Sequence, residues 1–212
     1  VFSPDQFANE LNCEAHQETT GAEILAQLTQ LKVRPDAFVA GVGTGGTIMG
    51  VGRALRSAYP TIQVCAMELA ESPTLSMGYK TGRHRIQGLF DEFVPGILKL
   101  DEVDDIVQIH DGDAILMAQR LSAELGLSVG MSSGANLVAA IKVAATLPEG
   151  ATVLTVFCDD SKKYLSTDLF KTEPVRADYI APRVEFSAIQ SFGYTDQTRF
   201  PDQQTREDAV IA

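Results

Sequence analysis

Residues 37–53 constrain the fold more than any other part of the sequence. A short apolar run at 37–40 leads into four closely spaced glycines, and an amphipathic run at 47–58 follows. Strand, glycine turn and helix in this order direct the N–H groups of the turn and the positive end of the helix dipole at one point. Because glycine lets a backbone approach a ligand closely, the stretch predicts an anion site, with Thr44 and Thr47 as additional hydroxyl donors.

Two kinds of ligand fit this turn, which we call the phosphate cup (residues 41–47). The glycines Gly41, Gly43 and Gly46 match the dinucleotide fingerprint G-x-G-x-x-G, and Glu68 ends the next apolar run, where the acid that binds a ribose would lie. The other ligand is a single phosphomonoester, held by amide and hydroxyl groups. A third interpretation is that the turn binds no ligand and its glycines only permit tight packing of a helix on a strand.

Apolar and amphipathic runs alternate along the rest of the chain. We expect strands at 62–67, 106–109 and 151–157 and helices at 47–58, 114–125 and 135–147. Thr20 and Glu23 have capping-box spacing, which predicts that a further helix begins there and ends before Pro35. The alternation predicts an α/β fold in which helices flank both faces of a parallel sheet. Ligands of such folds bind at the carboxyl ends of the strands.

Composition argues against several classes of partner and site. The net charge is −11, whereas nucleic-acid binding needs clustered Lys and Arg, so we expect no nucleic-acid partner. No apolar run reaches the length of about 18 residues that a membrane span needs. Cys13, Cys65 and Cys158 are odd in number and far apart; we expect free thiols, the last two buried, in a reducing, cytoplasmic compartment. The absence of a Cys/His cluster predicts no metal site.

A second glycine turn, at residues 130–134, follows a short apolar segment and precedes a helical pattern. Its sequence, GMSSG, also matches the nucleophile elbow G-x-S-x-G of α/β-hydrolases. That fold places its histidine after the serine, and all three histidines of this chain precede Ser132. A hydrolase triad in that order is therefore excluded. Ser132 and Ser133 either have another role in a site or cap the helix.

Five blocks of sequence occur in an order and spacing that resemble one enzyme family. The blocks are QFANELNCEAHQETTGAEI, GVGTGGTIMGVGRALR, HRIQGL, GMSSGAN and DDSKKYLST. Together they resemble the pyridoxal-phosphate enzymes of the cysteine synthase and cystathionine β-synthase type over about residues 4–170. The resemblance implies the large cofactor domain of a fold type II enzyme at residues 1–170. Residues 171–212, which show no sustained period, are expected to form an extended or partly disordered C-terminal tail.

The resemblance also implies what the cup binds. The 5′-phosphate of pyridoxal 5′-phosphate would be held by Gly43, Thr44, Gly45, Gly46 and Thr47. Ser132 would meet the pyridine nitrogen. A hydroxyl there does not stabilise a protonated pyridinium as a carboxylate would, so the ring would be a milder electron sink, suited to β-elimination. Gly88 would approach the substrate near the cofactor, and Gln6 would lie near the substrate carboxylate.

One part of the family pattern is absent from this sequence. The family binds its cofactor as a Schiff base on a lysine in an amino-terminal Ser-x-Lys-Asp/Glu segment, followed by a Ser-Gly-Asn loop, and neither segment occurs here. The first residue, Val1, would correspond to a point well inside the family's chains. We therefore expect the carboxyl-terminal part of such an enzyme, truncated at the N-terminus, with no catalytic residue of its own and inactive alone.

The reaction implied for the parent enzyme is β-replacement. An activated serine would lose its β-substituent, and sulfide or another thiol would add to give cysteine. The implied partners are a small amino-acid substrate and a second copy in a homodimer; the sequence does not identify the activated serine. Two alternatives stay open at this point: an NAD(P)-binding Rossmann domain of an oxidoreductase that uses residues 41–46 and Glu68, and a catalytically inactive partner protein with the same fold.

Overall fold

A single parallel sheet forms the centre of the molecule. The computed structural model describes residues 3–89 and 92–191. Four strands lie in the order β3-β2-β1-β4, with bounds β1 Ala37–Gly41, β2 Gln63–Leu69, β3 Asp105–Ile109 and β4 Val153–Thr155. The central strand β1 pairs with both β2 and β4, so that Ala37 lies opposite Gln63 on one side and Val153 on the other. The phosphate cup follows β1 directly and so lies at the carboxyl edge of the sheet.

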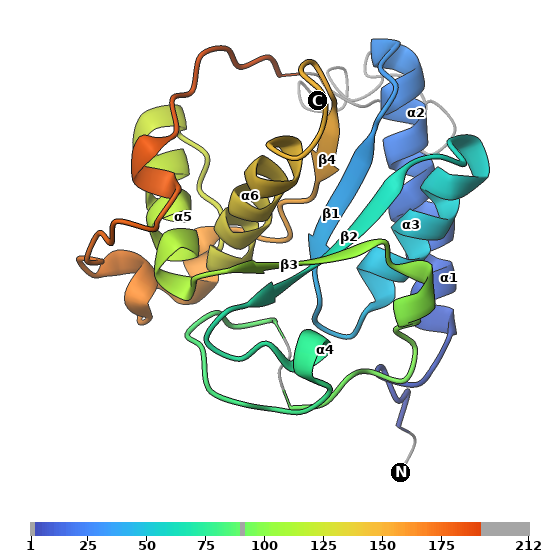
Figure 1. Cartoon of the computed structure of the whole chain (residues 1–212), viewed down its shortest axis with the longest axis horizontal. Helices are drawn as coiled ribbons and strands as arrows, with labels where there is room; N and C mark the ends of the chain where they lie inside the picture. Colours follow the sequence, from blue (N-terminus) through green and yellow to red (C-terminus); the bar gives the residue numbers. More distant parts are fainter. Residues whose placement is uncertain (1–2, 90–91, 192–212) are drawn as a thin grey trace, which may run out of the picture.

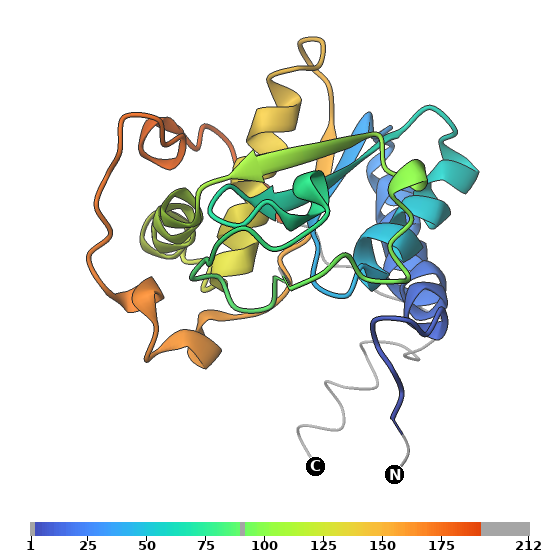
Figure 2. The same cartoon turned by 60° about the horizontal axis from the view of Figure 1, so that its bottom comes forward.

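Helices cover both faces of this sheet, as Figures 1 and 2 show. One face carries α1 (Leu11–His16), α2 (Ala22–Leu31) and α3 (Gly46–Ala58), and the other carries α5 (Asp111–Leu125) and α6 (Met131–Ala144). The short helix α4 (Thr74–Met77) follows β2. The predicted α/β fold, with helices on both faces of a parallel sheet, is therefore confirmed. No helix in the described part of the chain has the length and apolar character that crossing a membrane requires.

The two inner strands send alternate side chains to two different cores. Phe38 of β1 and Val64 of β2 pack with α1, α2 and α3. Their neighbours Val39 and Cys65 pack with α5 and α6. Successive side chains of a strand point to opposite faces, so a strand buried on both faces is apolar along most of its length. Glu68, near the end of β2, is a buried exception. Burial on both faces explains why the strands are visible in the sequence as continuous apolar runs.

Strand β4 is shorter than predicted, because side chains replace the sheet ladder beyond Thr155. The carbonyl oxygen of Val156 accepts a hydrogen bond from Asn136 Nδ2 at 2.8 Å. The N–H group of Cys158 donates to Ser133 Oγ at 3.0 Å. The prediction that Cys158 is buried is wrong, since it lies exposed at this edge, whereas Cys65 is buried as expected.

The predicted capping box is also wrong. Helical backbone begins at Leu11 and continues through a π-helical turn, Gln17–Gly21, into α2. Thr20 therefore lies inside a helix, and its hydroxyl bonds to His16 Nδ1 at 3.0 Å instead of capping. The turn lies where Gly21 passes α3, and a Cβ on Gly21 would come within 2.5 Å of Ala54 Cβ. Helix α6 begins at Met131, ahead of the predicted start at 135, which places Ser132 and Ser133 in its first turn.

The part of the predicted tail that the structure describes, residues 171–191, forms a segment that we call the strap. It has little regular structure but packs along α5 (Figure 1). The Asp113 carboxylate accepts hydrogen bonds from the backbone N–H groups of Ile180 and Ala181 at 2.8 and 2.7 Å, and Tyr179 is fully buried. The sequence pattern did not predict this docking. The rest of the predicted tail, 192–212, lies outside the described residues.

Arg85 fastens the strap to the loop that precedes Gly88. Its guanidinium contacts Asp111 Oδ1 at 2.6 Å and Glu173 Oε2 at 2.7 Å, and these two acidic side chains are only 8% and 6% exposed. The hydrogen bonds with Glu173 and Asp111 raise the pKa of Arg85 far above its usual value. Removing the guanidinium would leave two nearly buried carboxylates without their cation.

We predict that Arg85→Met lowers the free energy of unfolding by about 1–3 kcal/mol. The loss is smaller than for a fully buried ion pair, because the Arg85 side chain is 37% exposed and water screens its charge. Urea unfolding followed by circular dichroism measures the change. Lys162→Met is the control, because the Lys162–Asp160 pair is largely exposed and such pairs contribute about 0–1 kcal/mol. An equal loss in both variants would contradict the structural importance of the Arg85 cluster.

Candidate functional site

The phosphate cup has the backbone geometry of an anion site. Gly45 is the residue before α3 and adopts φ +96°, a conformation in which a side chain would be strained. The first N–H groups of a helix have no partner within the helix. Among the described residues, the backbone N–H groups of Gly43, Thr44 and Thr47 donate to no other group. They are available to an anion at the positive end of the α3 dipole.

Helix α1 holds both threonine hydroxyls of the cup. Asn12 Nδ2 donates to Thr44 Oγ1 at 2.9 Å, and His16 Nε2 lies 3.3 Å from Thr47 Oγ1. Asn12 and His16 are four residues apart and so project from the same face of the helix. A neutral histidine that donates from Nε2 leaves the Thr47 hydroxyl proton free to donate to a ligand.

Two glycines of α3 allow α1 to approach the cup this closely. A Cβ on Gly46 would lie 2.1 Å from Asn12 Oδ1, and a Cβ on Gly50 would lie 2.2 Å from the carbonyl oxygen of Cys13. Side chains at these positions would push α1 away and remove the support of the threonines. Sequence reasoning missed the roles of Asn12 and His16. The sequence feature that could have indicated these roles is their spacing: the two residues lie one helical turn apart in the block that precedes the cup.

Ser132 reaches the same edge of the sheet through α6. It lies in the first turn of that helix and is 7% exposed. One turn further along, Asn136 Oδ1 accepts a hydrogen bond from the backbone N–H of Gly41 at 2.8 Å. This bond joins the helix that carries Ser132 to the residue at which the cup begins.

The two predicted substrate residues also lie at the cup. A Cβ on Gly43 would come within 2.6 Å of the carbonyl oxygen of Gly88, which itself has φ +92°. The carbonyl oxygen of Gln6 accepts a second hydrogen bond from Asn12 Nδ2 at 3.0 Å. The structure thus gathers the cup, Ser132, Gly88 and Gln6 at one end of the sheet, although they are spread widely along the sequence.

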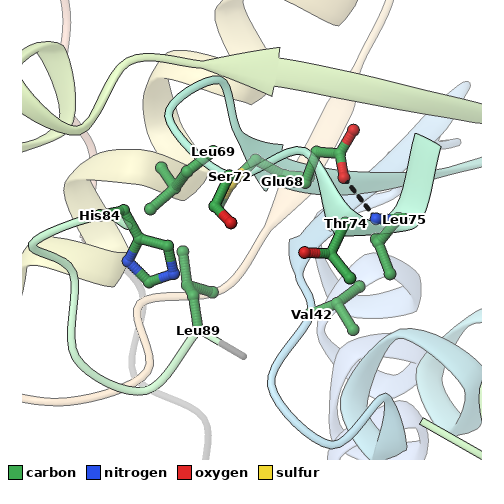
Figure 3. A pocket seen from close by; sticks show the side chains of 9 residues that line it. Val42, Glu68, Leu69, Ser72, Thr74, Leu75, His84 and Leu89 are labelled. Atoms are coloured by element: carbon green, nitrogen blue, oxygen red, sulfur yellow. Dashed lines mark hydrogen bonds between the residues drawn. The ribbon is translucent and has the colours of Figure 1, made fainter. Parts of the chain in front are cut away.

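The Glu68 carboxylate is occupied by protein groups and is not free to bind a ribose. It accepts hydrogen bonds from the backbone N–H of Leu75 at 2.7 Å and from Gln108 Nε2 at 3.1 Å, and it also bonds the Ser76 hydroxyl. Figure 3 shows Glu68 turned toward the start of α4, beside a cavity of about 10 Å³ that Val42 and His84 help to line. A cavity of that size holds about one water molecule. The carboxylate therefore stabilises a turn. The dinucleotide interpretation is left without the acidic residue that would bind the ribose.

The seven lysines occupy surface positions. Lys142 and Lys80 are half-buried, with Lys142 Nζ donating to the carbonyl oxygen of Gln108 at 2.8 Å and Lys80 paired with Glu92. The remaining five are exposed: Lys32, Lys99, Lys162, Lys163 and Lys171.

Comparison with known proteins identifies the family. The family model described as "Pyridoxal-phosphate dependent enzyme" matches residues 1–159. The chain belongs to this family. The resemblance drawn from the five blocks is confirmed, and with it pyridoxal phosphate as the cofactor of the family.

Named relatives narrow the resemblance. A cysteine synthase of Staphylococcus aureus (strain Mu50 / ATCC 700699) is 44% identical over 169 residues, which cover 80% of this chain and 54% of the relative. The probable cysteine synthase of Bacillus subtilis (strain 168) matches with the same identity and coverage. A crystal structure of a hydrogen sulfide-producing enzyme from Fusobacterium nucleatum superposes with a TM-score of 0.87 at 46% identity, covering 90% of this chain and 57% of that one.

The chain spans about half the length of the curated relatives it matches. The comparisons give no support to the NAD(P)-binding alternative or to an inactive partner protein. The residues present fit the phosphate end of pyridoxal phosphate, because the cup offers free N–H donors, two supported hydroxyls and glycines at the points of closest approach. Ser132, which the resemblance assigns to the pyridine nitrogen, lies at the same edge of the sheet.

We predict that Gly46→Ala weakens binding of 4′-deoxypyridoxine 5′-phosphate about ten- to a hundredfold. The added Cβ displaces Asn12, and a lost hydrogen bond to a charged group costs about 1.5–3 kcal/mol. Isothermal titration calorimetry measures the affinity. Gly96→Ala is the control, since the nearest atom to its added Cβ is the carbonyl oxygen of Phe7 at 3.4 Å. Unchanged affinity in Gly46→Ala would show that α1 does not support the cup.

We predict that His16 makes the chain less stable at mildly acidic pH. Burial lowers the pKa of His16 below 6.5, so the folded state binds fewer protons than the unfolded state. The resulting stabilisation is complete above pH 6.5 and is lost as the pH falls toward the lowered pKa. Urea unfolding between pH 5 and pH 7.5 should show a steeper decline for the wild type than for His16→Gln. Parallel curves for the two proteins would contradict this assignment.

Proposed function

We propose that this chain is the cofactor-binding part of a pyridoxal-phosphate-dependent enzyme of the cysteine synthase type. The observation that carries the proposal is the convergence of the cup, Ser132 and Gly88 at one edge of the sheet. We assign the 5′-phosphate to five residues, Gly43, Thr44, Gly45, Gly46 and Thr47. Residues 1–170 form the cofactor domain of the proposal, and 171–212 form a C-terminal segment that includes the strap.

The roles of the residues follow from their chemistry. When bound, pyridoxal phosphate supplies an electron sink for β-elimination from an amino acid and for β-addition to it. The N–H groups and hydroxyls of the cup bind its phosphate and fix the direction in which the ring extends. Ser132 donates a neutral hydrogen bond at the ring nitrogen and does not place a negative charge there. Gly88 has no side chain to obstruct a substrate, and Gln6 lies near the place assigned to the substrate carboxylate.

The proposed reaction is β-replacement on an activated serine to form cysteine, as the names of the cysteine synthase relatives support. The proposed substrate is a small amino acid, the proposed assembly is a homodimer, and the proposed location is the cytoplasm. No lysine of this chain stands in the family's Schiff-base segment. The chain alone should therefore bind the cofactor reversibly and catalyse no turnover.

Titration of the chain with pyridoxal phosphate, followed by borohydride reduction and peptide mapping, tests this proposal. We expect saturable binding that inorganic phosphate competes away, no stoichiometric label on any one lysine, and no binding of NAD or NADP. The Gly46→Ala variant serves as the control for binding in the cup. A stoichiometric label on one of the seven lysines, or saturable binding of NAD or NADP, would contradict the proposal.

A further inference from the structure

One buried amide joins the two ends of the candidate site. Asn136 is only 1% exposed. Its Oδ1 accepts from Gly41 N at 2.8 Å, while its Nδ2 donates to the carbonyl oxygen of Val156 at 2.8 Å and lies 3.6 Å from Cys158 Sγ. Gly41 begins the cup, and Val156 and Cys158 follow β4. Asn136 therefore connects the carboxyl ends of β1 and β4 from within α6.

The residues after β4 are in turn held against the first turn of α6. The N–H of Cys158 donates to Ser133 Oγ at 3.0 Å. Cys158 therefore lies against the first turn of α6, the turn that carries the Ser132 hydroxyl that we assign to the pyridine nitrogen.

The ligand explains why such a connection matters. The phosphate and the ring nitrogen of pyridoxal phosphate are separated by a nearly rigid ring, so their two binding groups must be held at a fixed spacing. The cup belongs to β1 and α3, whereas Ser132 belongs to α6. A site is pre-organised when side chains hold its binding groups at a fixed spacing. Asn136 belongs to the helix that carries Ser132 and is hydrogen-bonded to Gly41, where the cup begins.

We propose that Asn136 is a positioning residue that sets the spacing between the phosphate cup and Ser132, with Cys158 at the ring-nitrogen corner. The inference rests on the proposed function, because it concerns how that same site holds its cofactor. Asn136 acts through the backbone of Gly41 and Val156 and through Cys158, and it does not itself contact the ligand.

Two probes separate the two ends of the site. Inorganic phosphate reports on the cup alone. The second probe, 4′-deoxypyridoxine 5′-phosphate, adds the ring but carries no aldehyde that could react with lysines. We expect Asn136→Ala to weaken binding of the ring probe at least about tenfold more than binding of phosphate, since one hydrogen bond to the ring end is misplaced. Gln119→Ala is the matched control, because its side-chain amide also bonds two backbone groups, in this case by donating from Nε2 to the carbonyl oxygens of Leu169 and Lys171, away from the site.

Alkylation of Cys158 by N-ethylmaleimide gives a readout that a loss of stability alone does not produce. Cys158 is exposed, whereas Cys13 and Cys65 are buried and serve as internal controls. We expect the ring probe to slow alkylation of Cys158 in the wild type and phosphate not to slow it. In Asn136→Ala the protection should be lost. If that variant fails to fold, Asn136→Ser, which keeps a polar side chain, takes its place.

The outcomes separate this inference from the proposed function. If the wild type binds both probes but Asn136→Ala weakens them equally, or if phosphate protects Cys158 as well as the ring probe does, the positioning role is wrong and the proposed function stands. If the wild type binds neither probe, the proposed function is wrong and the inference fails with it.

Discussion

Burial of the central sheet on both faces is the constraint on which the rest of the structure depends. β1 and β2 lie between two groups of helices, and each sends alternate side chains into a different apolar core. Such strands have no face on which to carry polar chemistry. Polar groups can therefore gather only where the strands end, and in a parallel sheet the carboxyl ends all lie on the same edge.

The structure uses that edge by replacing ladder hydrogen bonds with bonds from side chains. Asn136 accepts a hydrogen bond from the N–H of Gly41 and donates one to the carbonyl oxygen of Val156. Ser133 accepts one from the N–H of Cys158. A buried amide left without these partners would cost free energy, so the side chains are needed for the strands to end there. In the cup, by contrast, no side chain that the structure describes bonds the free N–H groups at the start of the helix, so they are available to an anion.

Local periodicity predicted much of the fold, because strand, turn and helix at residues 37–58 follow from neighbouring residues. Gly88, Gln6 and Ser132 entered through the family resemblance and not from any period. The structure places them at the same edge of the sheet, and their roles stay predictions. Asn12 and His16 left only one signal, their spacing of one helical turn in the block before the cup. Asn136 could not be predicted, because a polar residue in a helix gives no sign of which distant group it bonds. The capping box at Thr20 failed for the related reason that packing of α1 against α3 started the helix earlier. The docking of the strap on α5 could not be predicted from the sequence, because it depends on the carboxylates of Asp113 and Glu173, which have no periodic pattern.

The central claim is that the carboxyl edge of the sheet is one site with a phosphate end and a ring end. Amide chemical shifts of the isotope-labelled chain, followed by nuclear magnetic resonance during titration with inorganic phosphate and then with 4′-deoxypyridoxine 5′-phosphate, test it most directly. The account predicts that phosphate shifts the amides of Gly43 and Thr47, and that the ring compound shifts these and also Ser132 and Cys158. Shifts confined to another part of the chain, or a ring compound that affects only the phosphate end, would contradict it.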